Sequence, residues 1–340
     1  MRIGRLWGVN LAVLLCAGAA LAQELITTRP EAEEPAKRGV FLDVEVTPKR
    51  GGAPLAGLTR QDFTITDNQA PQAITAFQAR DGSETPVAVT VVIDTLNTPY
   101  MKVAFARNEI KKFFQANNGK MAYPTELAIF TDTGTQIQEG LTKDGNALSD
   151  SLGHYRLKYP GFYEAEDRIQ LSIRALEQLT QHEATLPGRK LVLWVSSGWP
   201  ILEGPYRWIP ENQHQGIFDA ITDLSTAMRE ARVTLYCIEP DSFIGPFYYK
   251  GFLKGVRKPE QTGFGNLALQ VISTQTGGLV LYSPRDLPAL LGQAVSDSDA
   301  FYELSFDPVN GKPDEYHQIE VKVAKPGLIA RTRTGYYSRQ

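Results

Sequence analysis

Val87-Ala-Val-Thr-Val-Val-Ile93 is followed directly by Asp94-Thr-Leu-Asn-Thr98, and this stretch decides the fold class. Its first part is almost wholly apolar and β-branched, which predicts a strand buried on both faces. Two later stretches, Lys190-Leu-Val-Leu-Trp-Val195 and Val233-Thr-Leu-Tyr-Cys-Ile238, have the same character. Several buried strands of this kind are typical of a parallel sheet that helices cover on both sides.

Segments with helical periodicity alternate with these strands. The apolar residues that form their stripes are Val103, Ala106, Ile110 and Phe113; Ile169, Ile173, Leu176 and Leu179; and Ile217, Ile221, Leu224 and Met228. Strands that alternate with helices of this length predict an α/β domain with a doubly wound, mostly parallel sheet over residues 85–299.

Residues 39–80 and 300–340 follow a different pattern. Both contain short alternating strand signals, with Gly51-Gly52 as a turn in the first segment and Asn310-Gly311 and Pro326-Gly327 in the second. A β-element of about 40 residues is too small for us to expect it to fold stably on its own. We therefore predict that the two segments pack together as one small β-module.

The first 22 residues have the layout of an export signal. Arg2 and Arg5 precede an apolar stretch, and Ala20-Leu21-Ala22 is a small-x-small cleavage site. The apolar stretch is shorter than the roughly 20 residues of a membrane-spanning helix. We expect cleavage after residue 22, a flexible leader over residues 23–38, and a periplasmic or secreted chain without an integral membrane segment. The alternatives are an uncleaved anchor and lipidation at Cys16.

Composition restricts the classes of function. The 35 basic and 38 acidic residues give a formal net charge of −3, and the chain has no Lys/Arg-rich run, so we expect no nucleic-acid binding. Four histidines and two cysteines are few for a metalloenzyme or a thiol enzyme. Cys16 belongs to the export signal, and Cys237 lies in a predicted buried strand, so we expect no internal disulfide.

Three stretches that occur in order along the chain carry a family resemblance. They are Pro54-Leu-Ala-Gly-Leu-Thr-Arg-Gln-Asp-Phe-Thr-Ile-Thr-Asp67, Val91-Val-Ile-Asp-Thr-Leu-Asn-Thr98, and Tyr302-Glu-Leu-Ser-Phe-Asp-Pro308 with Gly335-Tyr336-Tyr337. Together they resemble the exported von Willebrand factor type A-related proteins typical of acidobacteria, over roughly residues 38–338. The resemblance implies a Rossmann-like type A domain, and such domains commonly hold a divalent cation at the carboxyl ends of the strands.

Mapped onto this chain, the resemblance implies Asp94, Thr98 and Ser197 as candidate Mg²⁺ ligands, since Mg²⁺ prefers oxygen donors. Leu96, however, stands where the family has its first serine, and Ser196-Ser197-Gly198 replaces the expected Thr-Asp-Gly. We therefore expect a degenerate metal site in which Asp94 accepts hydrogen bonds from its own loop. In the alternative with bound Mg²⁺, acidic side chains nearby would act as substitutes, namely Glu164, Glu166 or Asp167.

Two long insertions, residues 198–210 and 240–258, follow strands that should end at the same face. They carry an aromatic density unusual for loops: Trp199, Tyr206, Trp208, Phe243, Phe247, Tyr248, Tyr249 and Phe252. One interpretation is a lid in which the loops pack on each other. The other is a recognition surface for a protein, peptide or glycan.

Enzyme hypotheses have weaker support. Ser196 and Ser197 follow a predicted strand but lack the Gly-x-Ser-x-Gly context of a hydrolase nucleophile. We therefore expect an exported, non-enzymatic binding or adhesion module that recognises a protein or cell-envelope partner through its strand-end loops, with no cofactor. The alternatives are a Mg²⁺-dependent adhesion module and a hydrolase that uses Ser196 or Ser197.

Overall fold

A computed structural model of the chain describes residues 39–82, 85–156, 160–161, 163–199, 209–240, 249–283, 285–308 and 311–338. The predicted export signal and the predicted leader lie outside the described residues. Within the described ranges, no helix is both long and apolar enough to cross a lipid bilayer.

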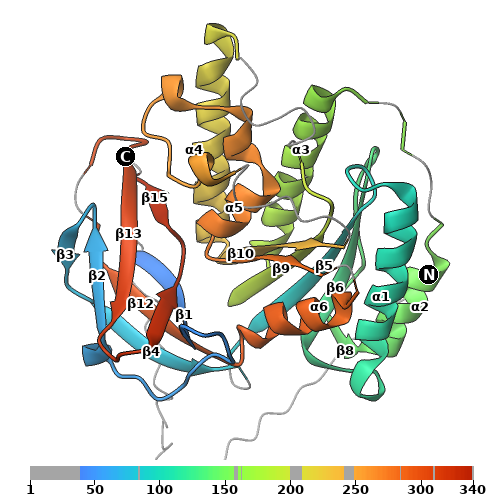
Figure 1. Ribbon diagram of the computed structural model, residues 1–340, viewed down its shortest axis with the longest axis horizontal. Coiled ribbons are helices and arrows are strands. Elements are labelled where there is room, and N and C mark those ends of the chain that lie inside the picture. The colour runs from blue at the N-terminus through green and yellow to red at the C-terminus, as the bar shows by residue number, and fades with distance from the viewer. Residues whose placement is uncertain are drawn as a thin grey trace, which may run out of the picture. The chain divides into compact units, whose positions relative to one another are not determined.

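A seven-stranded sheet forms the middle layer of the α/β part (Figure 1). Its strands are β5 (Val87–Asp94), β6 (Lys120–Thr131), β7 (Gly134–Ile137), β8 (Thr142–Asp144), β9 (Arg189–Val195), β10 (Val233–Glu239) and β11 (Val280–Tyr282). Their order is β11-β10-β9-β5-β6-β7, and β8 also pairs with β6. The pairs from β11 to β6 are parallel, whereas β7 and β8 run antiparallel to β6. The predicted doubly wound, mostly parallel sheet is confirmed.

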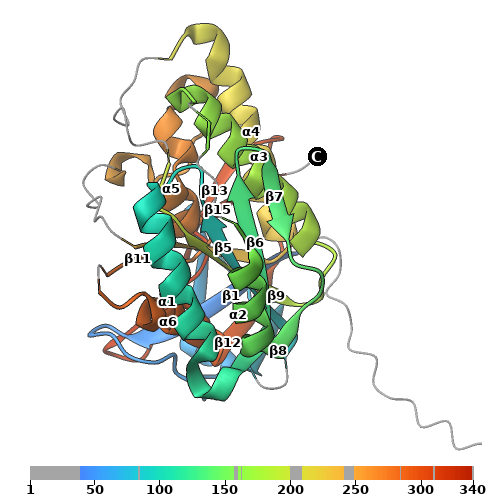
Figure 2. The same cartoon turned by 90° about the vertical axis from the view of Figure 1, so that its right-hand side faces the viewer.

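Helices cover both faces of this sheet (Figures 1 and 2). They are α1 (Tyr100–Gly119), α2 (Gly145–His154), α3 (Ala165–Glu183), α4 (His214–Glu230), α5 (Leu269–Gln275) and α6 (Leu287–Ser296). One hydrophobic core joins the sheet to α1, α2 and α6, and a second joins it to α3, α4 and α5. Short 3₁₀ helices in the described connections are η1 (Arg60–Asp62), η3 (Glu211–Gln213), η4 (Lys250–Phe252), η5 (Pro259–Gln261) and η6 (Phe264–Leu267).

The two cores explain why the central strands are apolar at almost every position. Successive side chains of a strand point to opposite faces of the sheet. Val91 and Ile93 therefore pack in the core with α1, whereas Val92 packs in the core with α3 and α4. Cys237 is fully buried in the second core and is a free cysteine, as predicted.

The remaining strands form two antiparallel sheets that share a third core. They are β1 (Val40–Pro48), β2 (Phe63–Asp67), β3 (Ala70–Gln72), β4 (Ala76–Asp81), β12 (Ala300–Phe306), β13 (Tyr316–Val323), β14 (Leu328–Arg331) and β15 (Gly335–Tyr337). The sheet orders are β14-β1-β12-β4 and β15-β13-β2-β3. Each sheet therefore contains strands from before and from after the α/β part.

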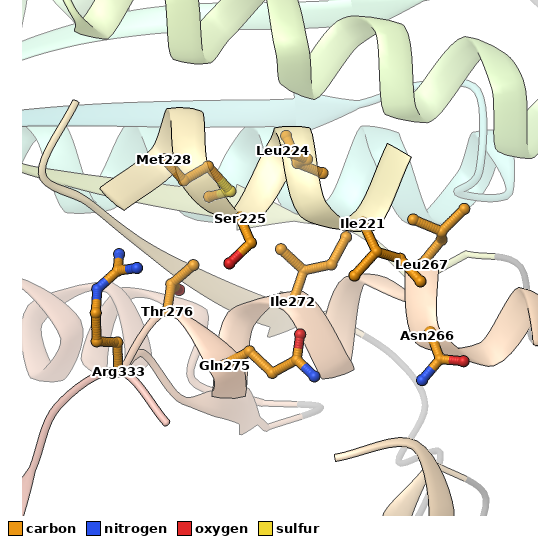
Figure 3. Close-up of a pocket in the computed structure, with 10 residues that line it drawn as sticks. All are labelled: Ile221, Leu224, Ser225, Met228, Asn266, Leu267, Ile272, Gln275, Thr276 and Arg333. Atoms are coloured by element: carbon orange, nitrogen blue, oxygen red, sulfur yellow. The ribbon is translucent and has the colours of Figure 1, made fainter. Parts of the chain in front are cut away.

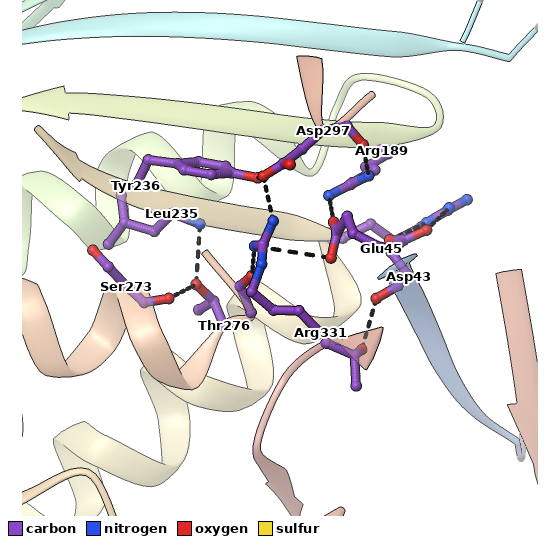
Figure 4. Close-up of polar contacts among 12 residues, drawn as sticks. Asp43, Glu45, Arg189, Leu235, Tyr236, Ser273, Thr276, Asp297 and Arg331 are labelled. Atoms are coloured by element: carbon purple, nitrogen blue, oxygen red, sulfur yellow. Dashed lines mark hydrogen bonds and ion pairs between the residues drawn. The ribbon is translucent and has the colours of Figure 1, made fainter. Parts of the chain in front are cut away.

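A buried ionic network connects these strands to the central sheet (Figure 4). Arg189 of β9, which is fully buried, pairs with Glu45 of β1. Arg331 of β14 pairs with Asp297, and the Tyr236 hydroxyl of β10 donates a hydrogen bond to Asp297 over 2.6 Å. Buried charges are costly unless they are paired, so this network favours one placement of β1 and β14 against β9 and β10.

Candidate functional site

The Asp94 carboxylate lies at the end of β5 and is fully buried. Its Oδ1 accepts hydrogen bonds from the backbone N–H groups of Leu96 at 3.0 Å and Asn97 at 2.8 Å. Its Oδ2 accepts from Asn97 Nδ2 at 2.9 Å, Trp194 Nε1 at 3.2 Å and Ser196 Oγ at 2.8 Å. A carboxylate offers about four lone-pair positions. The donors of this chain therefore use all of its acceptor capacity.

The topology explains how these donors converge. The strands β5 and β9 are parallel neighbours, with Ile93 opposite Val195, so the residues that follow them meet at one edge of the sheet. Burial raises the pKa of Asp94, and the hydrogen bonds from Asn97, Ser196 and Trp194 oppose that shift because they stabilise the ionised form.

The other candidate metal ligands lie beside this carboxylate. Thr98 is 5% exposed, and its Oγ1 accepts a hydrogen bond from the backbone N–H of Ser197 at 3.2 Å. The hydroxyl that reaches Asp94 belongs to Ser196, not to Ser197. Leu96, at the position of the family's first serine, is 1% exposed and packs in the core with Val92.

The proposed carboxylate substitutes lie at the start of α3. Glu164 and Asp167 are exposed there, and Glu166 is half-buried. Among the described residues, no group of three or more His, Cys, Asp and Glu side chains is arranged to hold a metal ion.

The aromatic residues differ from the prediction of an exposed surface. Trp199 is 1% exposed, its ring packs edge-on against Trp194 at a centroid distance of 5.1 Å, and its Nε1–H donates to the Leu267 carbonyl at 3.0 Å. Tyr249 is 6% exposed and packs in a small apolar cluster with Ala268 and Val271. Burial of these two rings fits the interpretation of a packed lid, because a buried ring offers no surface to a partner.

The other aromatic residues of the two insertions divide into two groups. Phe252 is half-buried and packs against the same cluster as Tyr249. The remaining residues lie outside the described part of the chain: Tyr206, Trp208, Phe243, Phe247 and Tyr248.

A groove of about 470 Å³ lies between the first halves of α3 and α4. Its lining combines apolar residues with charged and amide residues, namely Glu166, Ile169, Gln170, Ile173, Arg174, Glu177, Gln213, Gly216, Ile217, Ala220, Phe264 and Leu267. In a doubly wound fold the helix N-termini lie toward the carboxyl ends of the strands, so the groove is near the predicted binding face. Sequence reasoning missed it, although the small residues Gly216 and Ala220, four positions apart on α4, are a signal for it.

A second buried polar cluster lies on the sheet beneath α3. Thr90 Oγ1 is 2.6 Å from Glu183 Oε1 and 3.1 Å from Glu126 Oε1, and His182 Nε2 is 2.9 Å from Glu126 Oε1. Burial raises the pKa of Glu183 to about 7. The Thr90 hydroxyl faces both carboxyl groups, and the nearby charge of Glu126 adds to the rise in the pKa of Glu183. The sequence offers no signal for this cluster, because Thr90, Glu126 and the His182-Glu183 pair lie in three separate segments of the chain.

Neither a protein-family model nor a curated protein matches this chain. Solved structures do match. Human COPII-coat protein Sec24c has 10% identity and a TM-score of 0.35, with 74% of this chain and 44% of that chain covered. Manganese-loaded TRAP protein from Plasmodium vivax has 10% identity and a TM-score of 0.37, with 78% of this chain and 100% of that chain covered. The SpRpn10 VWA domain has 15% identity and a TM-score of 0.32, with 62% of this chain and 95% of that chain covered.

With identities of 10–15% and TM-scores below 0.5, these likenesses assign no ligand, activity or partner to this chain. The structure nevertheless contains the order of elements on which the sequence resemblance rests. Strand β5, the Asp94 turn, α1, the β6–β7 pair, α2 and α3, β9 with Ser196-Ser197-Gly198, α4 and β10 follow one another as expected. The α/β part of this chain therefore has the doubly wound architecture and the order of elements that its sequence resemblance to von Willebrand A-type domains implies.

Proposed function

We propose that this chain is an exported, non-enzymatic binding module that recognises a protein or cell-envelope partner at the carboxyl-end face of its central sheet, without a metal ion. One observation carries the metal-independent part of this proposal. The Asp94 carboxylate, at the position of the family's metal-ligating aspartate, accepts five hydrogen bonds from its own chain.

The residues at this position do not fit a divalent cation. Mg²⁺ requires several free oxygen ligands in near-octahedral geometry. Here the Trp194 N–H and the Asn97 amide direct hydrogens with partial positive charge at Asp94 Oδ2. Leu96 adds an apolar side chain where an oxygen ligand would be needed. The degenerate site is therefore a rigid hydrogen-bonded turn that holds the ends of β5 and β9 together.

The groove between α3 and α4 is the surface that best fits a partner. Its volume of about 470 Å³ lies in the range of natural ligand sites. Its floor contains buried isoleucines, Ile169, Ile173 and Ile217. Charged side chains of both signs, including Arg174 and Glu177, line it as well. An apolar floor with a polar rim is the usual anatomy of a protein interface.

The surroundings of Ser196 support the non-enzymatic part. The Ser196 hydroxyl donates directly to Asp94 and accepts the backbone N–H of Gly198 at 3.0 Å. A serine nucleophile instead needs a general base that is itself oriented by a third group. The direct bond to a buried carboxylate makes Ser196 part of the turn.

Affinity capture from cell-envelope extracts tests the proposal with a matched pair of variants. A Cβ at Gly216 meets no atom within 4 Å, so Gly216→Trp should fill the groove without disturbing the core, and Gly216→Ala is its control. We expect the wild-type chain and Gly216→Ala to retain the same partner and Gly216→Trp to lose it. Equal capture by all three would remove the groove from the proposal.

Two further capture experiments test whether the aromatic insertions or a metal ion are needed for recognition. A Trp208/Phe247/Tyr248→Ala variant that loses the partner while Gly216→Trp retains it would transfer recognition to the aromatic insertions. Capture in EDTA should equal capture in Mg²⁺. A partner that EDTA releases and Mg²⁺ restores would favour the metal-dependent alternative.

A further inference from the structure

The Arg333 side chain lies between β14 and β15 in the chain and is 8% exposed. It lines a partly open cavity of about 20 Å³ between α4, η6, α5 and the segment around Arg333. Figure 3 shows Arg333 and the Ser225 hydroxyl pointing into the same space between α4 and α5. No hydrogen bond or ion pair to the Arg333 guanidinium is present in the part of the chain that the structure describes.

An arginine in this position requires compensation for its charge. The guanidinium stays protonated in proteins, and an unpaired buried charge costs several kcal/mol. Burial lowers the pKa of Arg333 to about 9, and repulsion from Arg229 contributes to that shift, while Asp43 and Tyr316 oppose it. Asp43 is already in an ion pair with Arg232 at 2.5 Å. The C-terminal ends of α4 and α5 add partial negative charge nearby, but a partial charge does not replace a counterion.

The lining of the cavity carries one full positive charge and further polar groups. Its described residues include Arg333, Ser225 with its hydroxyl and Gln275 with its side-chain amide, and none of them is a carboxylate. The Asn266 amide also lines it, but its Oδ1 accepts from the Gly263 N–H and its Nδ2 donates to the Phe252 carbonyl. The Thr276 hydroxyl also lines it but already donates to the Ser273 carbonyl at 3.0 Å. The apolar lining residues close the rest of the space, namely Ile221, Leu224, Met228, Leu267 and Ile272.

We propose that this cavity is a binding site for one small monoatomic anion of the size of chloride, held by Arg333 and Ser225. A cavity needs about 10–15 Å³ to hold one water molecule. The space at Arg333 therefore accommodates one particle of that size and is too small to enclose a sulfate, phosphate or carboxylate ligand. The site goes beyond the proposed function, because it requires no macromolecular partner.

Chloride titration of the full chain, followed by chlorine NMR line broadening, tests the site. We expect saturable broadening for the wild type, at least a roughly tenfold loss of affinity in Arg333→Gln, and no change in the exposed control Arg285→Gln. Sulfate at equal ionic strength should not compete. Unchanged broadening in Arg333→Gln, or competition by sulfate as strong as by bromide, would overturn the proposal.

Two further measurements keep the proposal testable if Arg333→Gln does not fold. Ser225→Val fills the cavity and removes its hydroxyl, so it should weaken chloride binding several-fold, and unchanged affinity would contradict the site. Crystals soaked in bromide should show an anomalous peak beside the Arg333 guanidinium. Bromide peaks found only elsewhere on the molecule would also overturn it.

Discussion

The Asp94 carboxylate and the Arg333 guanidinium are both charged groups in the interior, and they differ in what surrounds them. Asp94 accepts five hydrogen bonds from its own chain, whereas Arg333 has no hydrogen bond or ion pair within the described residues. A charge that the chain satisfies completely becomes a structural element and is closed to ligands. A charge that the chain leaves unsatisfied beside a cavity is open to one.

The largest effect on stability should come from removing the Asp94 carboxylate, whose hydrogen bonds are all supplied by the chain. Asp94→Ala leaves the donors of Asn97, Trp194 and Ser196 buried without their acceptor. We expect the free energy of unfolding to fall by about 3–5 kcal/mol, measured by chemical denaturation. Asp167→Ala, an exposed acid at the start of α3, is the control and should change it by less than about 0.5 kcal/mol. A loss below about 1 kcal/mol for Asp94→Ala would show that these hydrogen bonds do not hold the turn.

Glu183 provides an intermediate case, since Thr90 supplies one partner and Oε2 has none among the described residues. Its pKa is about 7 in the folded state against 4.5 as the ordinary value, so the folded state binds this proton more tightly. The stability that Glu183 contributes is therefore fully present below about pH 4.5 and is lost as the pH rises through 7.

We expect the wild type to gain up to about 3 kcal/mol over Glu183→Gln when the pH falls from 7 to about 4.5. Chemical denaturation of both proteins across this pH range measures the difference in their free energies of unfolding. The contributions of the other titrating groups cancel in this difference, because both proteins contain them. Parallel stability curves would show that Glu183 is ionised in the folded state.

The smallest effect on stability should come from removing the Arg333 guanidinium. Arg333→Met keeps most of the side-chain volume and eliminates a buried charge that has no partner among the residues the structure describes. In chloride-free buffer we expect the free energy of unfolding to stay within about 1 kcal/mol of wild type or to rise. Thermal denaturation in sodium gluconate measures it. A loss above about 2 kcal/mol would mean that the guanidinium has strong partners of its own, and Arg333 would then be comparable to Asp94.

The sequence predicts the α/β sheet well because the signal is local. Each central strand is apolar on both faces, and Val92 and Ile93 pack in different cores as such a pattern requires. It also predicts the structural role of Asp94, since a carboxylate at a strand end can accept the N–H groups of its own turn. The aromatic insertions were harder, because a tryptophan in a loop can turn outward or inward. Trp199 turns inward, where its N–H reaches the Leu267 carbonyl.

The sequence pattern alone determines the strand and helix periods, and it predicts a degenerate metal site and an export signal in the first 22 residues. Only the folded arrangement brings Trp194 and Ser196 to Asp94 across about a hundred residues of chain. Only it places Arg333 beside a cavity, with no counterion in the described part of the chain. The physical reason is the range of the interactions. Hydrophobic periodicity is set by neighbouring residues, whereas the satisfaction of a buried charge depends on donors and acceptors that packing brings from distant segments.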